Sequence, residues 1–364
     1  MPEGKWPLIP DVAGLTKHVA IALASNKDED KNKFDNLLEE LELTGKDVNN
    51  IEDVLSFIRG MKEVAIGNSV RGFSIDELIK LEKNICEKIV GKLNVDLPDK
   101  DTPYHMLSKW ISIDRDKSIE VFTTNYDLLL EQAFEELSIP YFDGFVGSRQ
   151  SFFDLRAVEE DLIPKHWTRL WKIHGSINWF QKEGKEVFRS SRTSDIEGSH
   201  LIYPSHLKYD QSRKMPYLAM IDKLGLYLKQ SNSLLIVSGY SFNDEHLNDT
   251  ILRAIKSNPN TMVIALLFGT MTYEEQGKTK SRYPKAVDLA LNRSNLAIWC
   301  QDEAIIGTVR GKWKIRGEYD QDDNLGNCIS LKENNTNLNL GDYKVFGDFL
   351  QALIAYNQTQ GDEE

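Results

Sequence analysis

Short apolar runs alternate with helical patterns along most of the chain. β-branched and aromatic residues dominate these runs, as in strands that a parallel sheet buries on both faces. Helical patterns separate the runs, which is the order of elements in an α/β fold. We expect strands at 119–122, within 170–179 (ending in His174, Gly175 and Ser176), and at 234–238, 262–268 and 296–300, and we expect the most hydrophobic of them, 262–268, to be an inner strand.

The segment between residues 26 and 95 shows only helical periodicity. Its apolar positions recur every three or four residues, which predicts three amphipathic helices, and Ser74 is a candidate N-cap of the last one. A further helix is expected from Val12, with Asp11 as its cap. We interpret residues 28–115 as a helical block inserted into the α/β core, because its interleaved charges fit solvated faces.

Together these patterns predict a doubly wound, Rossmann-like parallel sheet with an inserted helical block and a C-terminal extension. We assign residues 1–310 to the α/β domain that contains the block, and residues 311–364 to the extension. The extension begins with a polar, Asn-rich stretch and ends with an amphipathic helix expected at 343–356.

Polar residues or glycines follow three of the predicted strands. The carboxyl ends of parallel strands share one edge of a sheet, so we expect the three groups to converge on one crevice. Each group also has an ordinary explanation: an Asn or Asp caps a helix, and an exposed His after a strand is more often a structural hydrogen-bond partner. The third group, at a strand-to-helix turn, suits a phosphate or ribose but is a weak signal alone. The groups are Asn125 with Asp127, His174 with Ser176, and Gly239 with Ser241.

Composition narrows the classes of function. The net charge of −12 over 364 residues argues against a broad phosphate-binding surface, so we expect no direct nucleic-acid binding. Neither a long apolar stretch nor a charged-then-apolar leader occurs, so we expect a cytoplasmic protein without a membrane segment. The three cysteines, Cys86, Cys300 and Cys328, are scattered and form no C-x-x-C pair, so neither a disulfide framework nor a zinc or other metal site is expected.

The strand-end motifs T-T-N-Y-D, K-I-H-G-S and G-Y-S, in this order, resemble the sirtuin family. More specifically, they resemble the bacterial sirtuin-like branch found in anti-phage defence, which includes subunits that assemble with a HerA-type ATPase. The L-I-Y-P segment and the G-x-S-x-x-D-x-x-L turn are also similar to that branch. The resemblance covers approximately residues 7–27 and 116–310.

The resemblance implies a site that cleaves NAD⁺ without zinc. In that family the asparagine orients water or the nicotinamide ribose and the histidine acts as general base, roles that would fall to Asn125 and His174. Asp127 would lie near the nicotinamide carboxamide. The other residues implied in NAD binding are Thr124, Gly175, Ser176, Gly239 and Ser241. Of these, Gly239 and Ser241 match the turn that holds the phosphate and ribose of NAD in that family.

Two departures from the family pattern bear on this expectation. The sirtuin zinc ribbon is absent, as in the defence branch, which favours NAD hydrolysis over protein deacylation. The family also opens with a strand and a G-A-G-x-S loop around the NAD diphosphate, whereas residues 6–11 here resemble the segment after that loop. We expect the loop to precede residue 1 in the natural protein, for example because of a late start codon. The competing interpretation is a degenerate subunit that no longer binds NAD by itself.

The resulting hypothesis is a sirtuin-like NAD⁺ glycohydrolase, homo-oligomeric, that serves as effector of an anti-phage complex with a HerA-type ATPase as candidate partner. The aromatic-rich loop 138–153 and the helical block are candidate regulatory surfaces. Two alternatives remain open: a non-catalytic sensor of NAD or ADP-ribose, and a nuclease or structural subunit of a DNA-translocating complex. The acidic balance and the lack of a carboxylate metal cluster argue against a nuclease.

Overall fold

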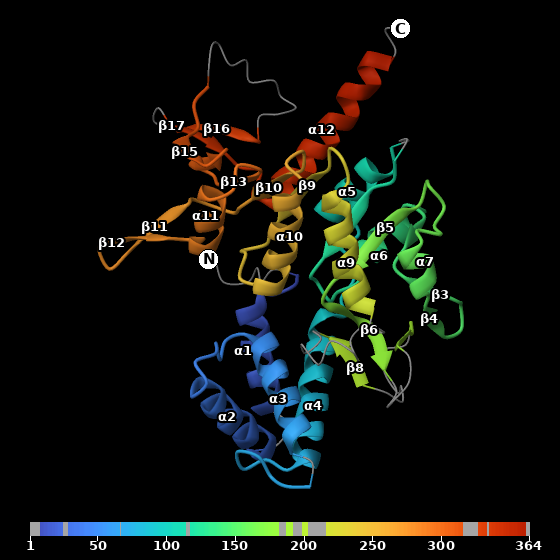
Figure 1. Ribbon diagram of the computed structural model, residues 1–364, viewed down its shortest axis with the longest axis vertical. Coiled ribbons are helices and arrows are strands. Elements are labelled where there is room, and N and C mark those ends of the chain that lie inside the picture. The colour runs from blue at the N-terminus through green and yellow to red at the C-terminus, as the bar shows by residue number, and fades with distance from the viewer. Residues whose placement is uncertain are drawn as a thin grey trace. The chain divides into compact units, whose positions relative to one another are not determined.

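The computed structural model describes residues 8–24, 28–65, 67–113, 117–181, 187–191, 199–202, 216–315, 327–332 and 335–361 (Figure 1). The chain folds into two compact units. The first comprises Met1–Asp96, Glu120–Gln132 and Tyr141–Met220, and the second comprises Leu97–Ile119, Ala133–Pro140 and Ile221–Glu364. The division predicted at residue 310 stays a prediction.

Helices of the first unit, drawn in blue to cyan in Figure 1, share one apolar core. Each presents an apolar stripe to the core, and the three helices of the block expose charged faces to solvent, which is the pattern read from the sequence. The Ser74 hydroxyl accepts from the Glu77 backbone in a capping box, and Asp11 Oδ1 accepts from Gly14 N at 2.7 Å. The predicted first helix and the three helices of the block are confirmed: α1 (Val12–Ala24), α2 (Asp28–Glu42), α3 (Ile51–Val64) and α4 (Ile75–Leu93).

A small parallel sheet follows in the first unit, with strand order β1-β5-β2. All five residues of the central strand β5 are buried, whereas all four residues of β1 are only partly buried. The prediction of a buried strand at 119–122 is therefore wrong in this respect, because β1 is an edge strand. Helix α6 (Leu129–Glu136) follows β1. The strands are β1 (Glu120–Thr123), β5 (Thr168–Lys172) and β2 (Tyr141–Phe142).

The first unit also contains an antiparallel sheet that the sequence did not predict. Its order is β3-β4-β7-β6-β8, and an aromatic cluster covers it, with the Phe145 and Trp179 rings 5.0 Å apart. Two predictions are wrong here. The segment 138–153, expected to be a loop, contains short strands, and the strand expected to end in His174, Gly175 and Ser176 ends earlier, with a turn between β5 and a second strand, β6. Of the L-I-Y-P segment, Tyr203 and Pro204 lie outside the described residues. The elements are β3 (Phe145–Val146), β4 (Ser151–Phe153), α7 (Leu155–Glu159), β6 (Gly175–Gln181), β7 (Val187–Arg189) and β8 (Ser199–Ile202).

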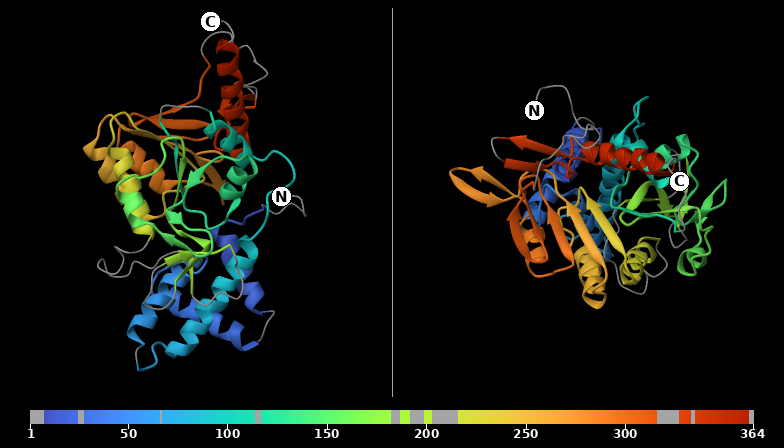
Figure 2. Two further views of the ribbon diagram at one scale, coloured as in Figure 1. Left: turned by 90° about the vertical axis from the view of Figure 1, so that its right-hand side faces the viewer. Right: turned by 90° about the horizontal axis from the view of Figure 1, so that it is seen from above.

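The second unit is built on a five-stranded sheet of order β15-β14-β13-β10-β9, whose strands run side by side in Figure 2. Strands β9, β10 and β13 are parallel, and β10 is an inner strand, as predicted. Strand β9 is an edge strand with Leu234 and Ile236 47% and 45% exposed, so the prediction that it is buried is wrong. The strands are β9 (Leu234–Ser238), β10 (Met262–Leu266), β13 (Leu296–Trp299), β14 (Glu303–Ile306) and β15 (Val309–Lys312), accompanied by α9 (Pro216–Lys229), α10 (Glu245–Ser257) and α11 (Pro284–Leu291).

The predicted C-terminal helix is confirmed as α12 (Tyr343–Gly361). It packs against α5 (Pro103–Ile111), where the Tyr104 and Tyr343 rings meet edge to face at 5.4 Å. Gln351 Nε2 also donates to the carbonyl oxygen of Met106 at 2.9 Å. The hairpin formed by β16 (Ile329–Lys332) and β17 (Asn335–Leu338) precedes α12, and a second hairpin joins β11 (Thr272–Glu275) to β12 (Lys278–Ser281).

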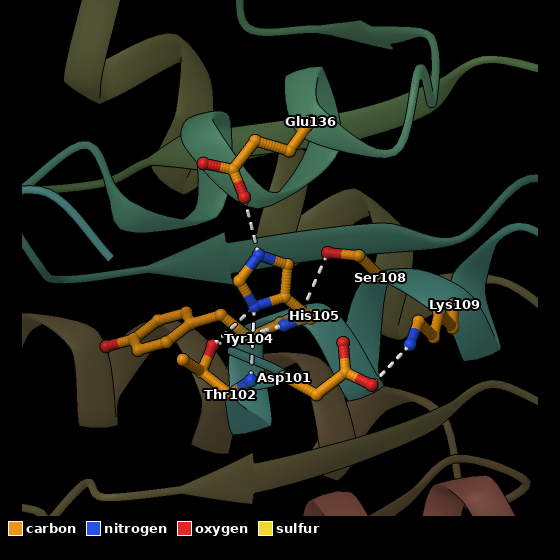
Figure 3. A network of polar contacts seen from close by, with 7 residues as sticks. All are labelled: Asp101, Thr102, Tyr104, His105, Ser108, Lys109 and Glu136. Carbon is orange, nitrogen blue, oxygen red and sulfur yellow. Dashed lines mark hydrogen bonds and ion pairs between the residues drawn. The ribbon is translucent and has the colours of Figure 1, made fainter. Parts of the chain in front are cut away.

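A buried histidine fixes the start of α5 within the second unit (Figure 3). The Thr102 backbone N–H donates to His105 Nδ1 at 3.1 Å, so the hydrogen of the neutral ring is on Nε2. That nitrogen lies 2.7 Å from Glu136 Oε2 of α6 and donates to it. His105 thus takes the place of the Glu or Gln of an ordinary capping box, and its contacts explain its burial without a catalytic role.

Parallel strands and intervening helices in both units confirm an α/β fold, while the doubly wound arrangement stays a prediction. Within the described part of the chain, no helix has both the length and the apolar character needed to cross a membrane.

Candidate functional site

Two of the three predicted groups of polar residues lie at the same edge of one sheet. Strands β1 and β5 are parallel neighbours, with Thr123 paired to Lys172 at their carboxyl ends. Asn125 follows the first strand by two residues and His174 follows the second by two residues. The predicted convergence is therefore confirmed for these two groups, which form the candidate site.

Backbone hydrogen bonds join the loop after β1 to the turn after β5. Ile173 N donates to Thr123 O at 2.8 Å, and Ile177 N donates to Tyr126 O at 2.9 Å. The buried hydroxyl of Ser176 donates to the same Tyr126 carbonyl at 3.3 Å. The loop is thereby held at both ends, and Asn125 lies between the two fixed points.

Glycine is required at the turn between β5 and β6. Gly175 has φ +88°, a left-handed conformation that side chains with a Cβ disfavour. The chain turns here, so that Gly175 and Ser176 begin β6. The prediction that they end the preceding strand is therefore wrong. The turn also places His174 between the two strands.

The two polar residues of the loop differ in their surroundings. The Asn125 side chain is exposed, while its backbone N–H donates to Thr123 Oγ1 at 3.0 Å, and Thr124 is half-buried. Asp127 is buried, and its Oδ1 accepts from the Leu129 backbone N–H at 3.0 Å at the start of α6. Capping, the ordinary explanation, therefore applies to Asp127, whereas Asn125 stands at the loop tip where a ligand can reach it.

A buried ion pair supports the loop from beneath. Lys172 is 1% exposed, and its Nζ contacts Glu131 Oε1 at 2.8 Å and donates to the carbonyl oxygen of Asp127. Burial raises the pKa of Glu131, and the Lys172 ammonium opposes that rise. Sequence reasoning passed over Lys172, although a lysine inside a buried strand is a signal that a partner must be present.

His174 is buried, so the prediction of an exposed histidine is wrong. Its Nδ1 lies 3.5 Å from Oε1 of Glu52, at the start of α3. The Tyr126 hydroxyl donates to the same Glu52 oxygen, and the Tyr126 ring stacks on the His174 ring at a centroid distance of 6.5 Å. Glu52 was assigned to a solvated face, because nothing in the local pattern distinguishes it from other acidic residues in a first helical turn.

The third predicted group belongs to the second unit, at the carboxyl end of β9. Gly239 is exposed with φ +73°, and an added Cβ would meet no atom within 4 Å, so conformation alone requires glycine there. Ser241 is half-buried in the turn that leads to α10. Asp244 caps that helix by accepting from the backbone N–H groups of His246 and Leu247. The strand-to-helix turn is as predicted, and the nucleotide contacts of Gly239 and Ser241 stay predictions.

Cysteine and metal chemistry find no support in the described residues. No group of three or more His, Cys, Asp and Glu side chains there is arranged to hold a metal ion. Cys86, Cys300 and Cys328 are buried free thiols. Burial raises the pKa of Cys86 and of Cys300 to about 12, so these thiols stay protonated and are poor nucleophiles.

One family match covers the stretch of chain that contains this site. The family model described as the SIR2-like domain matches residues 119–296, a range that begins before β1 and ends in β13. No curated protein matches the chain. The match supports a sirtuin-like family and an NAD-related function, because SIR2-like domains are typically NAD-dependent enzymes.

Proposed function

We propose that the protein is an NAD⁺ glycohydrolase that cleaves NAD⁺ to nicotinamide and ADP-ribose. One observation carries the proposal: the exposed Asn125 and His174 follow adjacent parallel strands, and backbone hydrogen bonds join the two segments that carry them, inside the SIR2-like match. An amide and an imidazole at one sheet edge are the two groups that hydrolysis of an N-glycoside needs, one to orient and one to accept a proton.

The chemistry requires little else from the protein. A water oxygen forms a bond to C1′ of the nicotinamide ribose while the bond from C1′ to the nicotinamide nitrogen breaks through an oxocarbenium-like state. Nicotinamide leaves as a neutral molecule, and the proton of the water passes to His174. Asn125 holds the water or the ribose. Asp127 Oδ1 accepts from the Leu129 N–H, and its other carboxylate oxygen lies near the nicotinamide carboxamide. A histidine suits the role of base because it changes charge close to neutral pH.

The biological setting we propose is anti-phage defence, with this chain as a homo-oligomeric effector that depletes NAD⁺ beside a HerA-type ATPase. Support for it comes from the L-I-Y-P segment and the G-x-S-x-x-D-x-x-L turn that resemble the defence branch. Size-exclusion chromatography with light scattering, for the chain alone and with the ATPase, tests both assemblies. A chain that stays monomeric and does not co-elute with the ATPase would contradict both assemblies.

The catalytic proposal is tested by nicotinamide release from NAD⁺, measured by chromatography. We expect His174→Ala and Asn125→Ala each to lower the rate at least 100-fold while the variants stay folded. His166→Ala is the matched control, since His166 is an exposed histidine of the same unit, and it should retain full activity. Retained turnover in His174→Ala would remove this histidine from the mechanism. Tight binding of NAD⁺ without any nicotinamide release would favour a sensor.

A further inference from the structure

One carboxylate oxygen meets two residues of the candidate site. Glu52 Oε1 accepts from the Tyr126 hydroxyl and lies 3.5 Å from His174 Nδ1, a nitrogen that is itself buried. The side chains are 17% exposed for Glu52 and 9% for His174, so little water screens this contact. A residue of the helical block is thus placed against the candidate base.

The start of α3 is fixed by its own contacts, which makes the position of Glu52 well defined. Asn50 caps the helix by accepting from the Glu52 backbone N–H at 2.9 Å. Thr16 Oγ1 of α1 donates to the carbonyl of Asn49 at 2.8 Å, and Ile51 is buried in the core of the block. An acidic residue in a first helical turn needs no further reason than the helix dipole. Yet the Glu52 carboxylate is directed to Tyr126 and His174, away from its own helix.

We propose that Glu52 is a positioning residue for His174, an inference that rests on the proposed NAD⁺ hydrolysis. The carboxylate oxygen lies 3.5 Å from Nδ1 and favours a hydrogen on that nitrogen, which leaves Nε2 unprotonated and able to accept a proton from water. The same carboxylate stabilises the imidazolium that forms when the proton arrives, and the Tyr126 hydroxyl fixes the carboxylate in place. The helical block therefore contributes to catalysis itself.

Kinetics of nicotinamide release separate a positioning role from a structural one. We expect Glu52→Gln to lower kcat about 100-fold with little change in KM, because substrate binding does not involve this residue. Glu52→Asp should recover part of the rate, and formate should restore activity to Glu52→Ala by entering the vacated space. Asp53→Asn is the matched control, because Asp53 is the adjacent acidic residue of the same turn and its ion-pair partner is Lys46, at 3.9 Å. A kcat within threefold of the wild type in Glu52→Gln, or a loss confined to KM, would overturn the proposal.

The tautomer of His174 provides a test that does not need activity. Long-range proton–nitrogen correlation spectra, with the His174 signals assigned by their loss in His174→Gln, should show hydrogen on Nδ1 in the wild type. Glu52→Ala, which removes the acceptor, should shift the ring toward hydrogen on Nε2. If no variant and not even the wild type releases nicotinamide, hydrolysis is refuted, while this spectrum still decides the Glu52 contact. An unchanged tautomer in Glu52→Ala would refute that contact.

Discussion

Replacing Lys172 by Met should destabilise the first unit strongly. Lys172 is 1% exposed and lies 2.8 Å from Glu131 Oε1. Removing one member of a buried ion pair leaves the other charge without compensation and costs about 3–5 kcal/mol. The variant also loses the donor to the Asp127 carbonyl, so the loop that carries Asn125 becomes less ordered and NAD⁺ turnover falls with it.

The loss should depend on pH in a defined direction. Burial raises the pKa of Glu131, so ionising this carboxyl in the folded state costs free energy that grows as pH rises through the raised value. Without the Lys172 ammonium to oppose it, the cost is larger. The destabilisation by Lys172→Met should therefore be greater at pH 8 than at pH 5, because a protonated Glu131 carboxyl leaves no unpaired charge behind.

Urea unfolding followed by tryptophan fluorescence measures this effect, since Trp171 is a fully buried neighbour. The matched control is Lys83→Met, which removes an exposed lysine whose partner is Glu87 and should change the free energy of unfolding by less than about 0.5 kcal/mol. Lys172→Met combined with Glu131→Leu should recover most of the loss, because an apolar pair of similar volume replaces a buried ion pair at little cost. A loss below about 1 kcal/mol in the single variant, unchanged between pH 5 and pH 8, would refute the reasoning.

Two further predictions concern stability away from the site. The Ser74 backbone N–H, with Lys33 and the Ser74 hydroxyl, lowers the pKa of Glu77 from 4.5 to about 2, so its ionised form stabilises α4 above pH 4.5 and that gain is lost as pH falls toward 2. Glu77→Gln should thus be less stable than the wild type at pH 7 by at most about 1 kcal/mol, since solvent screens this half-exposed group. In urea unfolding this difference between the two proteins should vanish at pH 2–3, and an equal difference at pH 7 and at pH 2–3 would contradict the prediction. Gly341→Ala would force a Cβ against the Leu267 carbonyl oxygen and should cost about 2 kcal/mol in thermal unfolding. Gly311→Ala, where a Cβ would meet no atom within 4 Å, should change stability little, and equal effects of the two substitutions would refute the steric reason.

The sequence predicted correctly those helices and caps that depend only on residues close together in the chain. The block helices, the Ser74 cap and the Asp11 cap follow from residue spacing within each helix. The hydrophobic run at 262–268 also indicated an inner strand, because only burial on both faces tolerates such a sequence.

Features that depend on distant pairings could not be predicted in this way. An apolar strand such as β9 has the same local pattern at the edge of a sheet as inside it, so its exposed Leu234 and Ile236 were not foreseen. Of the short strands within 138–153, β2 pairs with β5 and β4 pairs with β7, and both partners come later in the chain.

Within the candidate site, the strand ends gave Asn125 and His174, because polar residues after apolar runs are visible in the sequence. The burial of His174 and its contact with Glu52 were not visible, since 122 positions separate the two residue numbers and no motif links them. Lys172 was in view within the K-I-H-G-S motif, and its burial in β5 gives it a structural role.

The central claim is hydrolysis of NAD⁺, and product analysis in ¹⁸O-labelled water tests it most directly. The wild-type chain, and a form extended upstream to the next in-frame start, would each be incubated with NAD⁺ and the products analysed by mass spectrometry. We predict nicotinamide and ADP-ribose in equal amounts, with one ¹⁸O atom in the ADP-ribose and none in the nicotinamide, and no product from His174→Ala. Recovery of intact NAD⁺ from both forms, with the HerA-type ATPase present or absent, would contradict the claim.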